Sequence, residues 1–143
     1  MDALKKGMLL KPATESDLPQ IAKWIEADCF HTNQPSTFWL TGSDCFFASK
    51  VEDDEGTLAY VRIEEEDNDY RIHTQFAPES EVIRSRIAKG IINFITTLQQ
   101  IGKENGKERL ITESINPELI AFLARLGFVP FEGDDYVLQL ANS

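Results

Sequence analysis

Hydrophobic side chains recur three and four residues apart in three segments of the chain, which is the spacing that one face of an α-helix requires. Helices are therefore predicted over residues 14–28, 82–104 and 116–127. The first begins with a capping-box pattern, and the second is the longest predicted helix. The hydrophobic positions are Leu18, Ile21, Ala22 and Ile25 in the first helix, Ile83, Ile87, Ile91, Phe94, Ile95, Leu98 and Ile101 in the second, and Leu119, Phe122, Leu123 and Leu126 in the third.

The third of these helices has the most fully specified ends. Asn116 is a good N-cap because its side-chain oxygen can accept from free backbone N–H groups, and Pro117 suits the first helical position, where no N–H is needed. Glu118 places negative charge near the positive end of the helix dipole, and Arg125 lies in the last turn. Gly127 can take the left-handed conformation that ends a helix. These residues predict a helix with fixed ends.

Short hydrophobic runs between the helices predict strands. Two of these runs, residues 45–51 and 57–63, are joined by an acidic turn that ends at Gly56 and are expected to form a hairpin. Acidic clusters at the hairpin tips, residues 52–55 and 64–69, are interpreted as solvated loops. The predicted strands are residues 8–10, 45–51, 57–63, 70–78, 109–115 and 136–140, and the chain also allows a short helix at residues 36–40.

The chain is strongly acidic, with 24 Asp and Glu against 14 Lys and Arg and a formal net charge of −10. Its 143 residues, 1–143, are expected to form one domain. Sequence-independent binding to nucleic acid or to an anionic membrane needs a basic surface, so neither partner is expected. An acidic surface favours a cationic partner such as an amine, but it also keeps a protein soluble. Both explanations stay open.

No hydrophobic run approaches the roughly 18 residues that a membrane-spanning helix needs. The short hydrophobic run near the start is interrupted at Lys11 and Pro12, before the core of a signal peptide could form. A cytoplasmic location is therefore expected. The two cysteines give neither a disulfide framework nor the spacing of a zinc site, and no metal site is predicted.

The segment from Asn116 to Phe128, with the strand before it, resembles the GNAT acetyltransferase superfamily, in which a late strand leads to an Asn-initiated helix that ends in Gly-Phe. Gly127 and Phe128 match this pattern, whereas Leu123 stands where the family has a Tyr. Residues 10–18 also resemble the first strand and helix of the family. The resemblance implies an α+β, GNAT-like acyl-CoA N-acyltransferase fold over nearly the whole chain, with a central mixed, mostly antiparallel sheet flanked by helices.

The resemblance also implies a binding site for acetyl-CoA as co-substrate. In GNAT enzymes the strand before the long helix often ends in Val-x-Pro, and the segment Phe76, Ala77 and Pro78 is similar. The end of that strand, at Phe76 and Ala77, would then offer backbone hydrogen bonds to the pantetheine arm. Asn116 is implied to hydrogen-bond the same arm, although its capping role already accounts for it.

The glycine-rich turn that holds the coenzyme A diphosphate in this family is matched poorly. The family pattern is Arg or Gln, two residues, Gly, one residue, then Gly or Ala. Reading it from Arg86 puts Lys89 and Ile91 at the glycine positions. Reading it from Ser85 puts Ala88 and Gly90 there and loses the Arg, and Gly90 is then the candidate glycine at the cofactor. Arg84, Arg86 and Lys89 would instead supply positive charge to phosphates at the start of the helix. They are equally well explained as a basic surface that offsets an acidic protein.

Acyl transfer from a thioester to an amine needs a base for the ammonium group, a stabilised oxyanion and a proton for the leaving thiolate. The family assigns the last task to a Tyr, but Leu123 cannot donate a proton. Tyr136 is the candidate substitute, with Tyr60 and Tyr70 as alternatives that the sequence does not separate.

His73 is the candidate base, because an imidazole titrates near neutral pH and the residue lies on the strand that the resemblance places beside the acceptor site. Glu64 and Glu66 are the alternatives. A single His on a strand is also commonly a structural residue, so both roles remain open for His73.

Two functions are consistent with these features. The first is an N-acetyltransferase that transfers an acyl group from acetyl-CoA, by direct attack, to a small-molecule or peptide amine. The second is a non-catalytic binding or regulatory protein that kept a GNAT fold and lost standard coenzyme A binding, for which the missing glycines and Leu123 argue. A different acyl donor, such as an acylated carrier protein, is a third. The resemblance also implies a homodimer, with an exposed aromatic side chain within residues 38–47 as the candidate contact.

Overall fold

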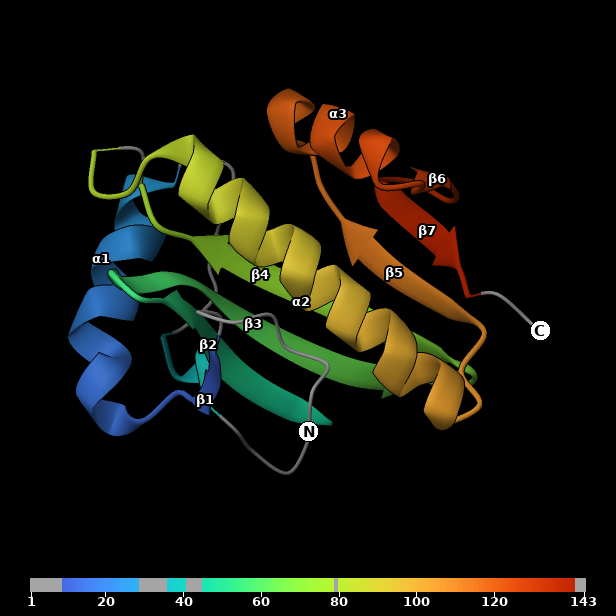
Figure 1. Cartoon of the computed structure of the whole chain (residues 1–143), viewed down its shortest axis with the longest axis horizontal. Helices are drawn as coiled ribbons and strands as arrows, with labels where there is room; N and C mark the ends of the chain where they lie inside the picture. The colour runs from blue at the N-terminus through green and yellow to red at the C-terminus, as the bar shows by residue number, and fades with distance from the viewer. Residues whose placement is uncertain (1–8, 29–35, 41–44, 79, 141–143) are drawn as a thin grey trace.

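The computed structural model describes residues 9–28, 36–40, 45–78 and 80–140. Within them, the strands form one mixed sheet, with helices packed against it (Figure 1). The strands are β1 (Leu9–Pro12), β2 (Phe47–Asp53), β3 (Gly56–Glu66), β4 (Asp69–Phe76), β5 (Arg109–Glu113), β6 (Val129–Pro130) and β7 (Asp135–Gln139). The helices are α1 (Leu18–Ala27), α2 (Arg84–Glu104) and α3 (Pro117–Arg125), with short 3-10 helices η1 (Glu15–Asp17) and η2 (Ser36–Trp39).

The order of the strands across the sheet is β1-β2-β3-β4-β5-β7-β6. Only the pairing of β4 with β5 is parallel, and every other neighbouring pair is antiparallel. The long helix α2 makes the crossover that a parallel pair requires. The predicted α+β fold, a mixed and mostly antiparallel sheet flanked by helices, is confirmed. The sequence missed β6, which is only two residues long.

The sheet is covered on both faces, as side chains on β4 show. Tyr70 points to α2, where its hydroxyl accepts a hydrogen bond from Asn105 at the end of that helix, at 2.6 Å. Gln75 is an odd number of residues further along the strand and therefore points to the opposite face. There its side-chain amide donates a hydrogen bond to the backbone carbonyl of Trp24 in α1. Since neighbouring residues of a strand point to opposite faces, α1 and α2 lie on opposite sides of the sheet. The interior of β3, from Leu58 to Ile63, is buried throughout.

Two predictions from the sequence, the start of α2 and the exposure of the acidic clusters, need correction. Helix α2 begins at Arg84, not near 82, because Ile83 is an extended N-cap residue with φ −70° and ψ 148°. The acidic clusters are not simply solvated tips, and that interpretation was wrong for two of their members. Asp69 is 7% exposed and pairs with Arg109, while Asp53 accepts two hydrogen bonds from Arg86.

Helix α3 has the ends that its sequence predicts. The side chain of Asn116 accepts a hydrogen bond from the backbone N–H of Glu118 at 3.0 Å. Gly127 has a φ of +104°, a conformation that side chains with a Cβ rarely adopt. The N–H of Phe128 then donates back to the carbonyl of Leu123 at 3.0 Å. Both helix ends are therefore fixed by short-range contacts.

Asp17 joins the start of α1 to the sheet through a buried polar cluster. Its carboxylate accepts from the N–H of Thr14 at 2.9 Å, from Lys50 of β2 at 3.1 Å and from the hydroxyl of Tyr60 of β3 at 3.2 Å. Burial alone would raise the pKa of Asp17, but these hydrogen bonds and the charge of Lys50 outweigh it and hold the pKa below its ordinary value. Burial raises the pKa of Tyr60, so its hydroxyl stays protonated as a donor.

Asp17→Asn is expected to reduce the free energy of unfolding by about 2 kcal/mol at pH 7, because it leaves Lys50 without a negative partner in a largely buried site. The loss should depend on pH. A carboxyl group whose pKa is lowered by folding stabilises the protein above its unfolded-state pKa, about 4, and loses that contribution as pH falls through the folded pKa. Urea unfolding of wild type and variant from pH 7 to pH 3 measures the difference.

Glu15→Gln is the matched control, because Glu15 is exposed in the same 3-10 turn. It should change the free energy of unfolding by no more than about 0.5 kcal/mol. A difference between wild type and Asp17→Asn that stays constant down to pH 3 would show that the charge of Asp17 does not stabilise the fold.

Candidate functional site at the divergence of β4 and β5

Strands β4 and β5 pair over only part of their length. The parallel pairing runs from Asp69 opposite Arg109 to Ile72 opposite Thr112, and the hydroxyl of Thr112 donates to the carbonyl of Ile72 at the last step. Beyond this point β4 continues to Phe76, paired only with β3, and the two strands separate (Figure 1). One edge of residues 73–76 is therefore left without a partner strand.

Backbone direction at this open edge follows from the pairing on the other side. The N–H of Ala77 donates to the carbonyl of Leu58, next to β3, at 3.0 Å. Since backbone polar groups alternate along a strand, the N–H and C=O of Phe76 point the other way, toward the gap between β4 and β5. Phe76 can therefore hydrogen-bond a ligand with its backbone, whereas the N–H of Ala77 is already engaged.

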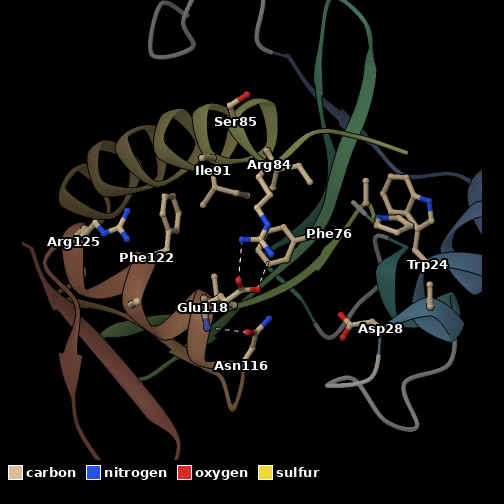
Figure 2. A pocket seen from close by; sticks show the side chains of 17 residues that line it. Trp24, Asp28, Phe76, Arg84, Ser85, Ile91, Asn116, Glu118, Phe122 and Arg125 are labelled. Carbon is tan, nitrogen blue, oxygen red and sulfur yellow. Dashed lines mark hydrogen bonds and ion pairs between the residues drawn. The ribbon is translucent and has the colours of Figure 1, made fainter. Parts of the chain in front are cut away.

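A cavity of about 650 Å³ opens beside this edge (Figure 2). It lies between the end of β4, the first two turns of α2, the start and one face of α3, and the end of α1. Most of its lining is hydrophobic, and the charged side chains are Asp28, Arg84, Glu118 and Arg125. The other lining residues are Trp24, Ala27, Phe76, Ala77, Pro78, Ser85, Ile87, Ala88, Ile91, Asn116, Leu119, Ala121 and Phe122.

Four of the residues predicted to bind the cofactor line this cavity: Phe76, Ala77, Arg84 and Asn116. They come from the end of β4, the start of α2 and the N-cap of α3, which meet where the strands diverge. Cβ atoms stand where the family has glycines, and two of them, on Ala88 and Ile91, are part of the lining. A cavity is nevertheless present at the start of α2.

The other three predicted cofactor residues lie elsewhere. Arg86 turns to the β2–β3 hairpin and binds both carboxylate oxygens of Asp53, at 2.8 and 2.6 Å, an interaction that raises the pKa of the guanidinium. Lys89 is exposed and Gly90 is buried in α2, and neither lines the cavity. Of the three cations predicted for the helix start, only Arg84 faces the site.

Arg84 makes a two-pronged ion pair with Glu118. Its two terminal nitrogens lie 2.8 and 2.9 Å from the two carboxylate oxygens, and the contact joins the start of α2 to the start of α3 across the cavity (Figure 2). Both side chains are more than half exposed. From the sequence, Glu118 is expected only to complement the helix dipole. The contact with Arg84 could not be predicted, because the partners are 34 residues apart.

A second cavity, of about 320 Å³, lies on the other side of the gap. It shares Asp28, Phe76, Asn116 and Leu119 with the larger cavity, so the two adjoin at the open edge of β4. No Lys or Arg among the described residues lines it. Its other lining residues are Phe38, Trp39, Ile72, His73, Thr74, Glu113, Ser114, Ile115 and Asp134.

His73, the predicted base, lies in the lining of this smaller cavity and is held from two sides. Its Nε2 is 3.0 Å from Oε1 of Glu64 on β3, and the ring of Phe38 packs edge-on against the imidazole at 5.0 Å between centroids. Glu64 also accepts from Nε of Arg62 at 2.7 Å. Burial would raise the pKa of Glu64, but the hydrogen bonds and charges of Arg62 and His73 outweigh it and lower the pKa. Glu64 is thus an ionised partner that can orient the imidazole.

The structure does not bring the predicted acid to the site. None of Tyr60, Tyr70 and Tyr136 lines either cavity. Tyr136 lies on β7, and the hydroxyls of the other two are occupied by contacts with Asp17 and Asn105. Glu66, an alternative base, is an exposed residue that pairs with Arg71.

Several lining residues were not singled out from the sequence, among them Asp28, Glu113 and Asp134. Glu113 and Ser114 lie three and two residues before Asn116, at the end of β5, and that position was a usable signal. Asp28 and Asp134 lie in connecting segments, and only the tertiary fold brings them to the gap. In the part of the chain that the structure describes, no cluster of three or more His, Cys, Asp or Glu could hold a metal ion. No helix there is long and hydrophobic enough to cross a membrane.

Comparison by sequence finds nothing, since no family model matches the chain and no curated protein matches it. Comparison by structure finds many similar folds. The ribosomal-protein-S18-alanine N-acetyltransferase from Escherichia coli is 14% identical, with 95% of this chain and 96% of that chain covered at a TM-score of 0.66. An aminoglycoside acetyltransferase in complex with coenzyme A is 12% identical, with 92% and 94% covered and a TM-score of 0.69.

The GNAT domain of PAT from S. lividans is a third similar structure. It is 12% identical, with 91% of this chain and 88% of that chain covered at a TM-score of 0.62. Identities this low carry information about the fold and not about residues or substrates. Together with the strand order and the gap between β4 and β5, these likenesses show that the chain has the fold of the GNAT N-acetyltransferases.

Proposed function

We propose that the protein is an N-acetyltransferase that transfers an acetyl group from acetyl-CoA to an amine. The observation that carries this proposal is the pair of adjoining cavities at the divergence of β4 and β5. One cavity, of about 650 Å³, is mostly hydrophobic and is lined by Arg84, as a coenzyme with a phosphate end and a pantetheine arm requires. The other contains His73 and carboxylates, as a cationic amine acceptor requires.

The larger cavity is the donor site in this proposal. The pantetheine arm runs along the open edge of β4 and hydrogen-bonds the backbone of Phe76, while the hydrophobic lining from α2 and α3 packs against it. The diphosphate lies at the start of α2, where the helix dipole is positive and Arg84 supplies a guanidinium. Solved similar folds support this assignment, since the aminoglycoside acetyltransferase is described with coenzyme A bound.

The reaction needs a neutral amine beside the thioester. The amine nitrogen attacks the carbonyl carbon, the C–N bond forms, and the C–S bond then breaks to release the thiolate. His73, held by Glu64, accepts the proton that the ammonium group must lose. In this proposal the backbone C=O of Phe76 accepts from the pantetheine arm, and its N–H, which also points to the gap, stabilises the oxyanion.

The leaving thiolate takes up the remaining proton. No Tyr lines the site, and Leu123 is buried at the position where the resemblance would place one. A thiol has a pKa of about 8.5, so a thiolate is a good leaving group and solvent can protonate it. The missing Tyr therefore removes an accelerating group without preventing the reaction.

A non-catalytic GNAT-fold protein is the second candidate. It is favoured by the contact between Arg84 and Glu118, which occupies the guanidinium at the start of α2, and by the Cβ atoms where glycines are usual. Such a protein would use the cavities for a different ligand or none. Binding of coenzyme A separates the two candidates.

Calorimetric titration with acetyl-CoA and with CoA at low salt is expected to show micromolar binding. Ala121→Phe should weaken it at least about tenfold, because Ala121 lines the larger cavity and a phenyl group there would fill it. Ala124→Phe is the matched control, since Ala124 is exposed on the same helix outside the lining and should leave the affinity unchanged. No binding of either ligand up to millimolar concentration would contradict the acetyl-CoA proposal.

His73→Gln is expected to lower kcat/KM about a hundredfold or more with any amine acceptor found by screening, because a general base contributes roughly 10²–10⁴-fold. The affinity for CoA should not change, since His73 lies in the smaller cavity. Glu66→Gln is the control, as Glu66 is exposed and away from both cavities. Full activity in His73→Gln would show that His73 is a structural residue.

A further inference from the structure

The ion pair between Arg84 and Glu118 crosses the donor site instead of stabilising the core. Arg84 is the first residue of α2 and Glu118 the second of α3, and both side chains belong to the lining of the larger cavity. Their side chains are 59% and 66% exposed. In Figure 2 the two side chains extend toward one another from the two helices. An exposed ion pair contributes little to the free energy of folding. The position of this pair over the cavity therefore points to an effect on ligand binding instead.

The contact uses the same groups that a phosphate would need. A guanidinium binds a carboxylate and a phosphate through the same planar pair of N–H donors, so Glu118 and a diphosphate compete for Arg84. The carboxylate of Glu118 also repels an incoming anion. The other charged residues of the lining are Arg125 and Asp28, so among the described residues the lining has two cations and two anions and no excess of positive charge.

We propose that Glu118 is an internal competitor of the donor's diphosphate, an autoinhibitory contact that holds Arg84 across the cavity until a diphosphate displaces it. The inference rests on the proposed function, since it assigns the donor site to that cavity. Binding requires the side chain of Arg84 to turn from Glu118 to the diphosphate, and the free Glu118 carboxylate then faces solvent. Both side chains are exposed enough to make this exchange without unfolding a helix.

The contact is weak enough for a ligand to break. Exposed ion pairs are worth up to about 1 kcal/mol, which corresponds to a factor of about five in a binding constant. The competition therefore reduces affinity without preventing binding. The competition for Arg84 affects only ligands that carry phosphate. Glu118 therefore reduces the part of the affinity for coenzyme A that its phosphate groups contribute.

The test compares CoA with pantetheine, which has the same thiol arm and no phosphate. Glu118→Gln is expected to raise the affinity for CoA about fivefold and to leave the affinity for pantetheine unchanged. Arg84→Met should weaken CoA binding, and in that background Glu118→Gln should give a smaller gain. Glu108→Gln is the charge-matched control, because Glu108 is exposed and precedes β5 at the end away from the gap.

An unchanged or weaker affinity of Glu118→Gln for CoA would overturn the proposal. A gain of the same size for pantetheine would also overturn it, since the effect would then not depend on phosphate. If the wild-type protein binds neither CoA nor pantetheine, the proposed function fails, and the competition is decided with inorganic pyrophosphate as the probe. Tighter binding of pyrophosphate by Glu118→Gln than by wild type would support the internal competitor, and equal binding would reject it.

Discussion

The end of pairing between β4 and β5 is the constraint on which the site depends. The hydroxyl of Thr112 donates to the carbonyl of Ile72 where the parallel ladder stops, and from there β4 stays with β3 while β5 leads away to α3. A parallel pair that separates leaves backbone groups without partners, and such groups need a ligand or water. The gap thus contains the two cavities and exposes the backbone N–H and C=O of Phe76 to a ligand.

Charged contacts determine which side chains remain available at this gap. Arg86 is held by Asp53 on the hairpin, and Tyr60 is held by Asp17 in the buried cluster, so neither serves the site. His73 is instead oriented toward the smaller cavity by Glu64, and Arg84 is held over the larger cavity by Glu118. The GNAT fold is thus combined with a larger cavity in which the charge of Arg84 is partly neutralised by Glu118.

Local signals were sufficient for most of the elements, although not for the two-residue strand β6, and they were insufficient for the site. The ends of α3 could be predicted because Asn116 and Gly127 act within one helical turn. The roles of Arg86 and Tyr136 could not, because the partner of Arg86 lies 33 residues away and the distance of Tyr136 from the gap depends on the strand order. The positions of His73 and Phe76 in the cavity lining could be predicted, because the resemblance puts their strand beside the acceptor site.

The central claim, that coenzyme A occupies the gap between β4 and β5, is tested most directly by the backbone amide spectrum of the protein during titration with CoA. The amide signal of Phe76 is expected to shift with ligand concentration, together with those of residues at the start of α2. The amide of Val51, which is buried on β2, two strands away from β4, should not shift. If the shifted signals belong to residues away from the open edge of β4 and the Phe76 signal is unchanged, coenzyme A does not occupy the gap.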